Sequence, residues 1–275
     1  MEKTDYKNRL NKDKDKYSLK QMTKRNSELT LTLRKSHLNS HMNNVRKEKL
    51  TVFDESNILA IRMNQVENSI PEDFNVHFNS SDRQLEIINE FISLDFTSII
   101  NIGYYTEENK ISFIYFALNE LNEMVYKSDE IDLYKEENAE LLNSIFHNII
   151  SLIDKMKDNP VIVYNSLNVL IGLSCDVFGI TNSILSEENI INTLNQFENS
   201  TYIGIHSNII WLYHNCIAQQ QNNALYLFQN SKILISFLKV FEYMNANICN
   251  QKKEMSWNDC ATAFNLLKAL IESIP

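Results

Sequence analysis

The chain has 275 residues, of which 44% are apolar, so it is long enough to bury a sizeable hydrophobic core. Its 4 glycines and 3 prolines are far fewer than average. Doubly wound sheets and phosphate-binding loops need glycine at turns and close backbone approaches, whereas long helices joined by short polar turns do not. Composition therefore predicts an all-α protein.

The net charge of −9 is divided unevenly along the chain. Residues 1–50 have 14 lysines and arginines against 6 acidic residues, a net charge of +8, while the remaining 225 residues have 12 against 29, a net charge of −17. A basic arm is typical of nucleic-acid binding, but an acidic body of this size would repel phosphates. We therefore expect no nucleic acid among the partners.

No part of the sequence predicts secretion or membrane insertion. The first residues, MEKTDYKNRL, lack the apolar centre of a signal peptide, and no apolar run is long enough for a transmembrane helix. The cysteines are far apart and form no C-x-x-C pair, so we expect small buried hydrophobic residues in a reducing compartment. They are Cys175, Cys216, Cys249 and Cys260.

The N-terminal arm is predicted to combine disorder with one basic helix. Residues 1–17 are charged and almost devoid of apolar side chains, which favours disorder. In SELTLTLRK (27–35) the leucines alternate as they would in a strand, yet they also belong to two apolar stripes on opposite faces of one helix. We therefore predict a long basic helix within residues 18–50, followed by a linker over 51–68.

The body, residues 69–275, is predicted to be a succession of helices. Breaks are expected at Gly103, at 158–160, at Gly179, at 199–200 and near Asn250. Apolar periodicity predicts helices over 81–95, 109–127, 136–157, 161–175, 184–197, 206–219, 222–245 and 256–273.

Five of these segments share an apolar pattern that can be superimposed. The superposition makes one position of each segment equivalent and gives about 44 residues per repeat, within the armadillo and HEAT range. The sequence thus predicts an α-solenoid of about five degenerate repeats. The equivalent positions are Asn89, Tyr115, Val169, Trp211 and Phe264.

The arm resembles the importin-beta-binding segment that opens importin alpha (karyopherin alpha). In that family a basic cluster precedes a Glu-Val-Thr-Val-Glu-Leu-Arg-Lys-like core, and further basic residues follow. Here Lys24 and Arg25 match part of the cluster, and Arg46 and Lys47 lie in the later basic stretch. The core is matched by Glu28, Leu29, Thr30, Leu31, Leu33, Arg34 and Lys35.

The body carries a weaker resemblance to the same family. Residues 70–94 look like its first armadillo repeat, and NIIWLYHNCIAQ (208–219) looks like the third helix of a later repeat. The resemblance implies an armadillo groove in which an asparagine amide pairs with a peptide backbone and indoles hold lysine and arginine stems. It implies cargo-binding roles for Trp211 with Asn215, and weaker ones for Tyr115 with Asn119.

The departures from the family pattern leave the groove in question. Importin alpha proteins have about ten repeats, whereas this chain has room for about five. The other equivalent positions, Asn89, Val169 and Phe264, offer no tryptophan. For Trp211 with Asn215, a core tryptophan and a surface asparagine remain the alternative, and for Tyr115 the core interpretation is favoured.

No catalytic or metal-binding motif is present, so we expect neither an enzyme nor a cofactor. His206 and His214 lack a third ligand at similar spacing. The resemblance implies a nuclear import adaptor, found in cytoplasm and nucleus, that links basic localisation signals on cargo to importin beta. The alternatives are an armadillo scaffold that has lost cargo binding, or an unrelated all-α protein with a disordered basic tail.

Overall fold

The computed structural model describes residues 83–96, 109–126, 136–174, 180–219 and 223–249, with a few single residues outside these ranges. All of them belong to one compact unit, Val45–Pro275. The arm, with every candidate importin-beta-binding residue from Lys24 to Lys47, lies outside the described residues. The linker over 51–68 also lies outside them, as do the expected breaks at Gly103, Gly179 and Asn250. These remain predictions.

Every element within the described ranges is helical, which confirms the all-α prediction for this part of the chain. Two short 3-10 turns, η1 (Glu136–Asn138) and η2 (Gln196–Asn199), adjoin α8 and α11. The α-helices are α5 (Gln84–Ser93), α7 (Lys110–Tyr126), α8 (Ala139–Lys155), α9 (Pro160–Leu173), α10 (Ile180–Ser186), α11 (Glu188–Asn195), α12 (Ile203–Gln219), α13 (Asn223–Asn230) and α14 (Ile233–Cys249).

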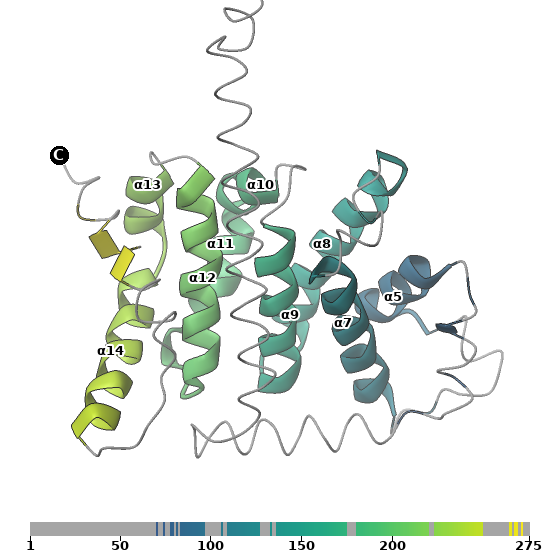
Figure 1. Cartoon of the computed structure of the whole chain (residues 1–275), viewed down its shortest axis with the longest axis horizontal. Coiled ribbons are helices and arrows are strands. Elements are labelled where there is room, and N and C mark those ends of the chain that lie inside the picture. Colours follow the sequence, from purple (N-terminus) through teal and green to yellow (C-terminus); the bar gives the residue numbers. More distant parts are fainter. Residues whose placement is uncertain are drawn as a thin grey trace, which may run out of the picture. The chain divides into compact units, whose positions relative to one another are not determined.

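The helices of this unit pack in two rows. In the first row α7, α9, α12 and α14 follow one another in chain order, and each packs against the next (Figure 1). In the second row α5 packs on α8 and α8 on α11, while α5 also covers α7 and α8 covers α9. The shorter helices α10 and α13 pack against α12. Successive helices thus contact mainly their neighbours, as in helical repeat arrays; the armadillo type itself stays a prediction.

Helix α9 occupies the centre of the first row and has no polar face. Every one of its residues except Tyr164 is buried. Asn159 caps its first turn, accepting a hydrogen bond from the Ile162 N–H at 3.3 Å, and Pro160 follows at the first helical position. The break predicted at 158–160 is therefore confirmed, and its physical cause is the Asn159 cap followed by Pro160.

A phenylalanine cluster closes the α5 end of the unit. Phe74 contacts Phe113 edge-on, with ring centroids 4.9 Å apart, and Phe91 packs on Phe113 at 5.4 Å. Helix α5 ends at Leu94, which adopts a left-handed backbone conformation with φ 69°. The following amide closes the helix end, because the Asp95 N–H bonds to the Glu90 carbonyl at 2.8 Å.

Two predicted helices are divided in the structure. The segment predicted over 184–197 is broken at Glu187, whose extended backbone separates α10 from α11. The segment predicted over 222–245 is broken at Ser231, between α13 and α14. The break predicted at 199–200 is confirmed, since η2 ends at Asn199 and α12 begins three residues after Ser200.

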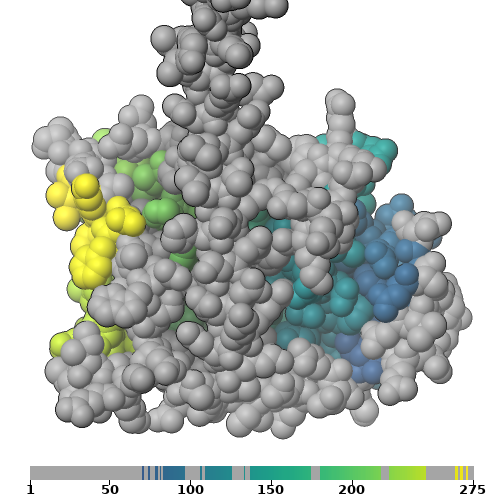
Figure 2. Space-filling model, in the orientation of Figure 1, coloured from purple at the N-terminus to yellow at the C-terminus, as the bar shows by residue number. Residues whose placement is uncertain are grey.

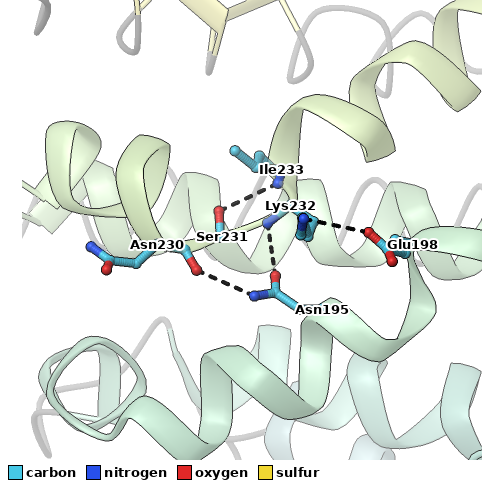
Figure 3. Close-up of polar contacts among 6 residues, drawn as sticks. All are labelled: Asn195, Glu198, Asn230, Ser231, Lys232 and Ile233. Atoms are coloured by element: carbon cyan, nitrogen blue, oxygen red, sulfur yellow. Dashed lines mark hydrogen bonds and ion pairs between the residues drawn. The ribbon is translucent and has the colours of Figure 1, made fainter.

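The break at Ser231 is held from another helix (Figure 3). The Asn195 amide group donates to the Asn230 carbonyl at 3.2 Å and its oxygen accepts the Lys232 N–H at 2.7 Å. The Ser231 hydroxyl accepts the Ile233 N–H at 3.3 Å, and the Lys232 ammonium lies 3.8 Å from a Glu198 carboxylate oxygen. Periodicity over 222–245 could not reveal this turn because its main partner is 35 residues away in sequence.

The structure places the superimposed positions in different rows, and the repeat equivalence of those in the first row stays a prediction. Tyr115, Val169 and Trp211 lie on α7, α9 and α12, three successive helices of the first row. Asn89 lies on α5, in the second row, where its amide oxygen accepts a hydrogen bond from Asn148 of α8 at 2.9 Å. Its polar contacts therefore serve the α5–α8 interface, and it is not equivalent to the other three.

We expect Asn195→Ala to lower the free energy of unfolding by about 1 kcal/mol, because two backbone groups of the α13–α14 turn lose their partner together. Urea denaturation followed by circular dichroism measures the difference. Asn192→Ala, which removes an exposed asparagine one turn earlier on α11, is the matched control and should change the midpoint little. Equal effects of the two substitutions would contradict a specific role for Asn195.

Candidate functional site

The candidate cargo-binding residues lie on two helices of the first row. Tyr115 and Asn119 are on α7, and Trp211 and Asn215 are on α12. Helix α9 packs between these two helices. The structure therefore places both pairs in one row of helices, as the resemblance requires, but separates them by a helix that carries Val169 at the equivalent position.

Trp211 is largely buried. It has only 7% of its surface exposed, and the imidazole of His214 contacts the indole edge-on at 6.0 Å between centroids. A tryptophan that holds the stem of a lysine or arginine needs an accessible ring face. The burial of Trp211 accords with the core interpretation that the sequence left open.

The Asn215 amide hydrogen-bonds to the neighbouring helix α9. Its nitrogen donates to the Ile171 carbonyl at 3.1 Å and to the Ser174 hydroxyl at 2.8 Å, so both amide hydrogens bond to the C-terminal end of α9. The residue is also buried. In this conformation the Asn215 N–H groups fasten α12 to α9 and are not directed at a bound peptide.

Asn208 makes the same kind of contact two turns earlier on α12. Its amide nitrogen donates to the Asn168 side-chain oxygen at 2.8 Å and to the Tyr164 carbonyl at 3.3 Å. Sequence analysis missed Asn208, although one signal was present: Asn168 interrupts the apolar sequence of α9 and needs a buried partner. Together Asn208 and Asn215 fix the register of α12 along α9.

The two candidate residues on α7, Tyr115 and Asn119, differ in burial. Tyr115 is buried, with 2% of its surface exposed, while Asn119 is half-buried one turn further along. This agrees with the core interpretation favoured for Tyr115. Cargo binding by Tyr115, Asn119, Trp211 and Asn215 stays a prediction.

Sequence analysis also missed the structural role of His206. The ring is buried on α12, with Nε2 3.0 Å from the Ser200 carbonyl and Nδ1 3.1 Å from the Ser236 hydroxyl of α14. Because a carbonyl can only accept, Nε2 carries the hydrogen and Nδ1 accepts from Ser236. His206 therefore ties the start of α12 to α14.

Burial lowers the pKa of His206 below its ordinary value. The hydrogen bond to the Ser200 carbonyl opposes this shift, and the nearby cation of Lys239 reinforces it. The imidazole is thus held neutral, the form that can accept from Ser236. Burial likewise raises the pKa of Tyr213 on α12, whose hydroxyl is buried.

The described residues offer no evident site for a metal ion, since no three His, Cys, Asp or Glu side chains gather there. Cys216 is buried and outside any disulfide. None of the described helices combines the length and the apolar character needed to span a bilayer.

Comparisons of the chain with protein-family models, with curated proteins and with solved structures found no match. The resemblance to importin alpha therefore rests on the residues of this chain alone.

We expect the free energy of unfolding to fall as the pH drops from about 7.5 to about 5.5, in part through His206. The unfolded histidine titrates near 6.5 and the folded one lower, so below about pH 6.5 the unfolded state binds more protons and stability is lost. His206→Gln, whose amide can donate to Ser200 and accept from Ser236, should make this acid loss smaller. Urea denaturation at several pH values measures it.

The matched control for this prediction is His147→Gln, which removes an exposed imidazole on α8. If burial is the cause, the acid loss should shrink more in His206→Gln than in His147→Gln. A His206→Gln protein with an unchanged pH dependence would contradict the assigned tautomer and the burial argument.

Proposed function

We propose that the chain is a nuclear import adaptor of the importin alpha type, in which an armadillo-like body binds basic localisation signals and the N-terminal arm binds importin beta. The observation that carries the proposal is the first row of helices, because Tyr115, Val169 and Trp211 occupy superimposable sequence positions on its successive members. A repeat array of this kind presents a continuous surface to a partner and needs no catalytic group.

The division of charge supports the same proposal. The body's net charge of −17 favours a basic peptide as ligand, and the arm's net charge of +8 favours an acidic receptor. In the arm, Leu31 and Leu33 would supply apolar contacts while Arg34 and Lys35 would make charge-assisted hydrogen bonds. Cytoplasm and nucleus are the compartments such an adaptor would occupy.

A second candidate is a helical-repeat scaffold that has lost cargo binding. The contacts of Asn215 favour it, because both amide hydrogens bond to α9 and would have to leave Ile171 and Ser174 before pairing with a peptide. The burial of Trp211 favours it as well. In this candidate the basic arm binds a partner other than an import receptor.

Importin beta binding tests the adaptor proposal directly. We expect the full chain to bind importin beta in isothermal titration calorimetry, and joint replacement of Leu31, Leu33, Arg34 and Lys35 by alanine to weaken binding at least a hundredfold, about 2.7 kcal/mol. The loss arises because apolar anchors and charged contacts disappear together.

The matched control for the arm removes the same residue types outside the core. Replacing Leu10, Lys12, Lys14 and Leu19 by alanine also removes two leucines and two cations, and it should weaken binding by less than tenfold. Equal losses from both quadruple variants would mean that the arm acts through its overall composition and not through this core, and an unchanged affinity of the core variant would overturn its assignment.

Peptide binding separates the two candidates. An adaptor should bind a fluorescent basic localisation peptide saturably, and Asn215→Ala should weaken that binding by roughly tenfold, about 1.4 kcal/mol. A scaffold should show no saturable binding, while Asn215→Ala still lowers its free energy of unfolding by about 1 kcal/mol through the lost α9 contacts. Fluorescence anisotropy and urea denaturation measure the two effects, with Asn143→Ala at an exposed position of α8 as the matched control.

A further inference from the structure

A titratable side chain lies inside the contact between α12 and α14. The two helices pack against each other (Figure 1), and Ile233, Phe237 and Val240 of α14 are buried. Ser236 lies within the same stretch of α14 and is 4% exposed, and its hydroxyl is 3.1 Å from Nδ1 of His206, which is 1% exposed. This helix contact therefore includes an imidazole that can take up a proton near neutral pH.

Both ring nitrogens of His206 have hydrogen-bond partners when the ring is neutral. Nε2 donates to the Ser200 carbonyl at 3.0 Å, and Nδ1 accepts from the Ser236 hydroxyl. A second proton would go to Nδ1, which would then become a donor. The Ser236 hydroxyl can turn and accept, so the bond itself can survive. The ring would nevertheless be a cation that has lost most of its hydration inside the contact.

The charges around the ring do not compensate for that cation. Lys239 of α14 acts on His206 and disfavours its protonation. Glu242, the acidic residue of α14, is exposed, and Glu198 of η2 lies 3.8 Å from the Lys232 ammonium. The other helices that pack against α12, namely α9, α10 and α13, contain no Lys, Arg, Asp or Glu. Among the described residues, the charge that acts on the ring is thus a cation.

The remaining titratable side chains of these helices are tyrosines, cysteines and one further histidine. Tyrosines and cysteines are neutral around pH 6 to 7, so they supply no charge there. The histidine, two turns beyond His206 on α12, has its ring against the Trp211 indole. These side chains are Tyr164 of α9, Tyr213, His214 and Cys216 of α12, Tyr226 of α13, and Tyr243 and Cys249 of α14.

Helix α14 is covered by fewer described helices than the centre of the row. Helix α9 packs against α7, α8 and α12, whereas α14 packs against α12 and α13, and its Phe241 contacts Phe264 at 5.2 Å between centroids. Lys239 and Glu242 are exposed, and part of α14 reaches the surface in Figure 2, where it is yellow-green. In a helical array such an element opens at a lower free energy than a fully enclosed one.

We propose that the α12–α14 contact is a pH-sensitive joint, in which protonation of His206 favours a state with α14 released from α12. The sign follows from where the proton binds. In the released state the imidazole is hydrated and takes up a proton near pH 6.5, whereas in the closed state burial and Lys239 oppose protonation. The closed state is therefore fully stable above that pH and loses stability as the pH falls below it. The inference does not depend on the proposed import function.

Amide hydrogen exchange of the full chain at about pH 7.5 and 5.5, read by mass spectrometry, tests the proposal. At both pH values the amides of α14 should be less protected than those of α9, because α14 opens without unfolding of the whole unit. Protection factors, which correct for the intrinsic effect of pH on exchange, should fall severalfold for α14 on acidification. The fall is at most about tenfold, because one imidazole that titrates near 6.5 is responsible.

Two substitutions, each with a matched control, assign the effect to the joint. His206→Gln can still donate to Ser200 and accept from Ser236 but cannot be protonated, so it should remove most of the fall for α14. His147→Gln, at an exposed position of α8, should change that fall less. If His206→Gln does not fold, Lys239→Gln gives a second test, because loss of the cation makes protonation of the closed state easier and should reduce the fall. Glu242→Gln is its exposed control on the same helix.

Three results would overturn the proposal. Equal protection of α9 and α14, with the same fall in both, would place the acid effect in unfolding of the whole unit. A fall for α14 that persists in His206→Gln, or that His147→Gln removes equally, would show that His206 is not the group responsible. A fall that Lys239→Gln leaves unchanged would show the same where His206→Gln does not fold.

Discussion

The burial of α9 on every side is the constraint on which the rest of the fold depends. A helix with no polar face is stable only when other helices surround it, and here α7, α8 and α12 do so. Its few polar side chains must then find partners inside the protein. Asn165 bonds to the Val161 carbonyl at 2.8 Å within α9, while Asn168 and Ser174 receive hydrogen bonds from α12. Apolar packing brings the helices together, and these bonds set their register.

Asparagine supplies directional contacts at several interfaces of the unit. Asn89 and Asn148 join α5 to α8, Asn208 and Asn215 join α12 to α9, and Asn195 holds the turn between α13 and α14. Apolar contacts alone tolerate sliding of one helix along another, whereas a buried amide pair is satisfied in only one position. The residue type that would form a peptide-binding ladder in importin alpha is thus used here between helices of the same chain.

The sequence predicted the helices well where local signals decide them. The pair Asn159-Pro160 indicated the start of α9, and the scarcity of glycine predicted an all-helical body. The division at Ser231 was beyond prediction, because its cause is Asn195 on another helix. The spacing of Trp211 and Asn215 was visible, but the direction of the Asn215 amide was not. In a helix that is buried on several sides, periodicity does not tell which side chain faces which neighbour.

The dependence of α9 on a later helix has a consequence for synthesis on the ribosome. Leu173, the last residue of α9, is made well before α12 is completed at Gln219. At roughly 5–20 residues per second, the apolar flank that α12 will cover stays open to water for several seconds. During that interval α9 is a strongly apolar segment of the nascent chain, of the kind that chaperones recognise. Codon choice between these two helices would set how long that protection is needed.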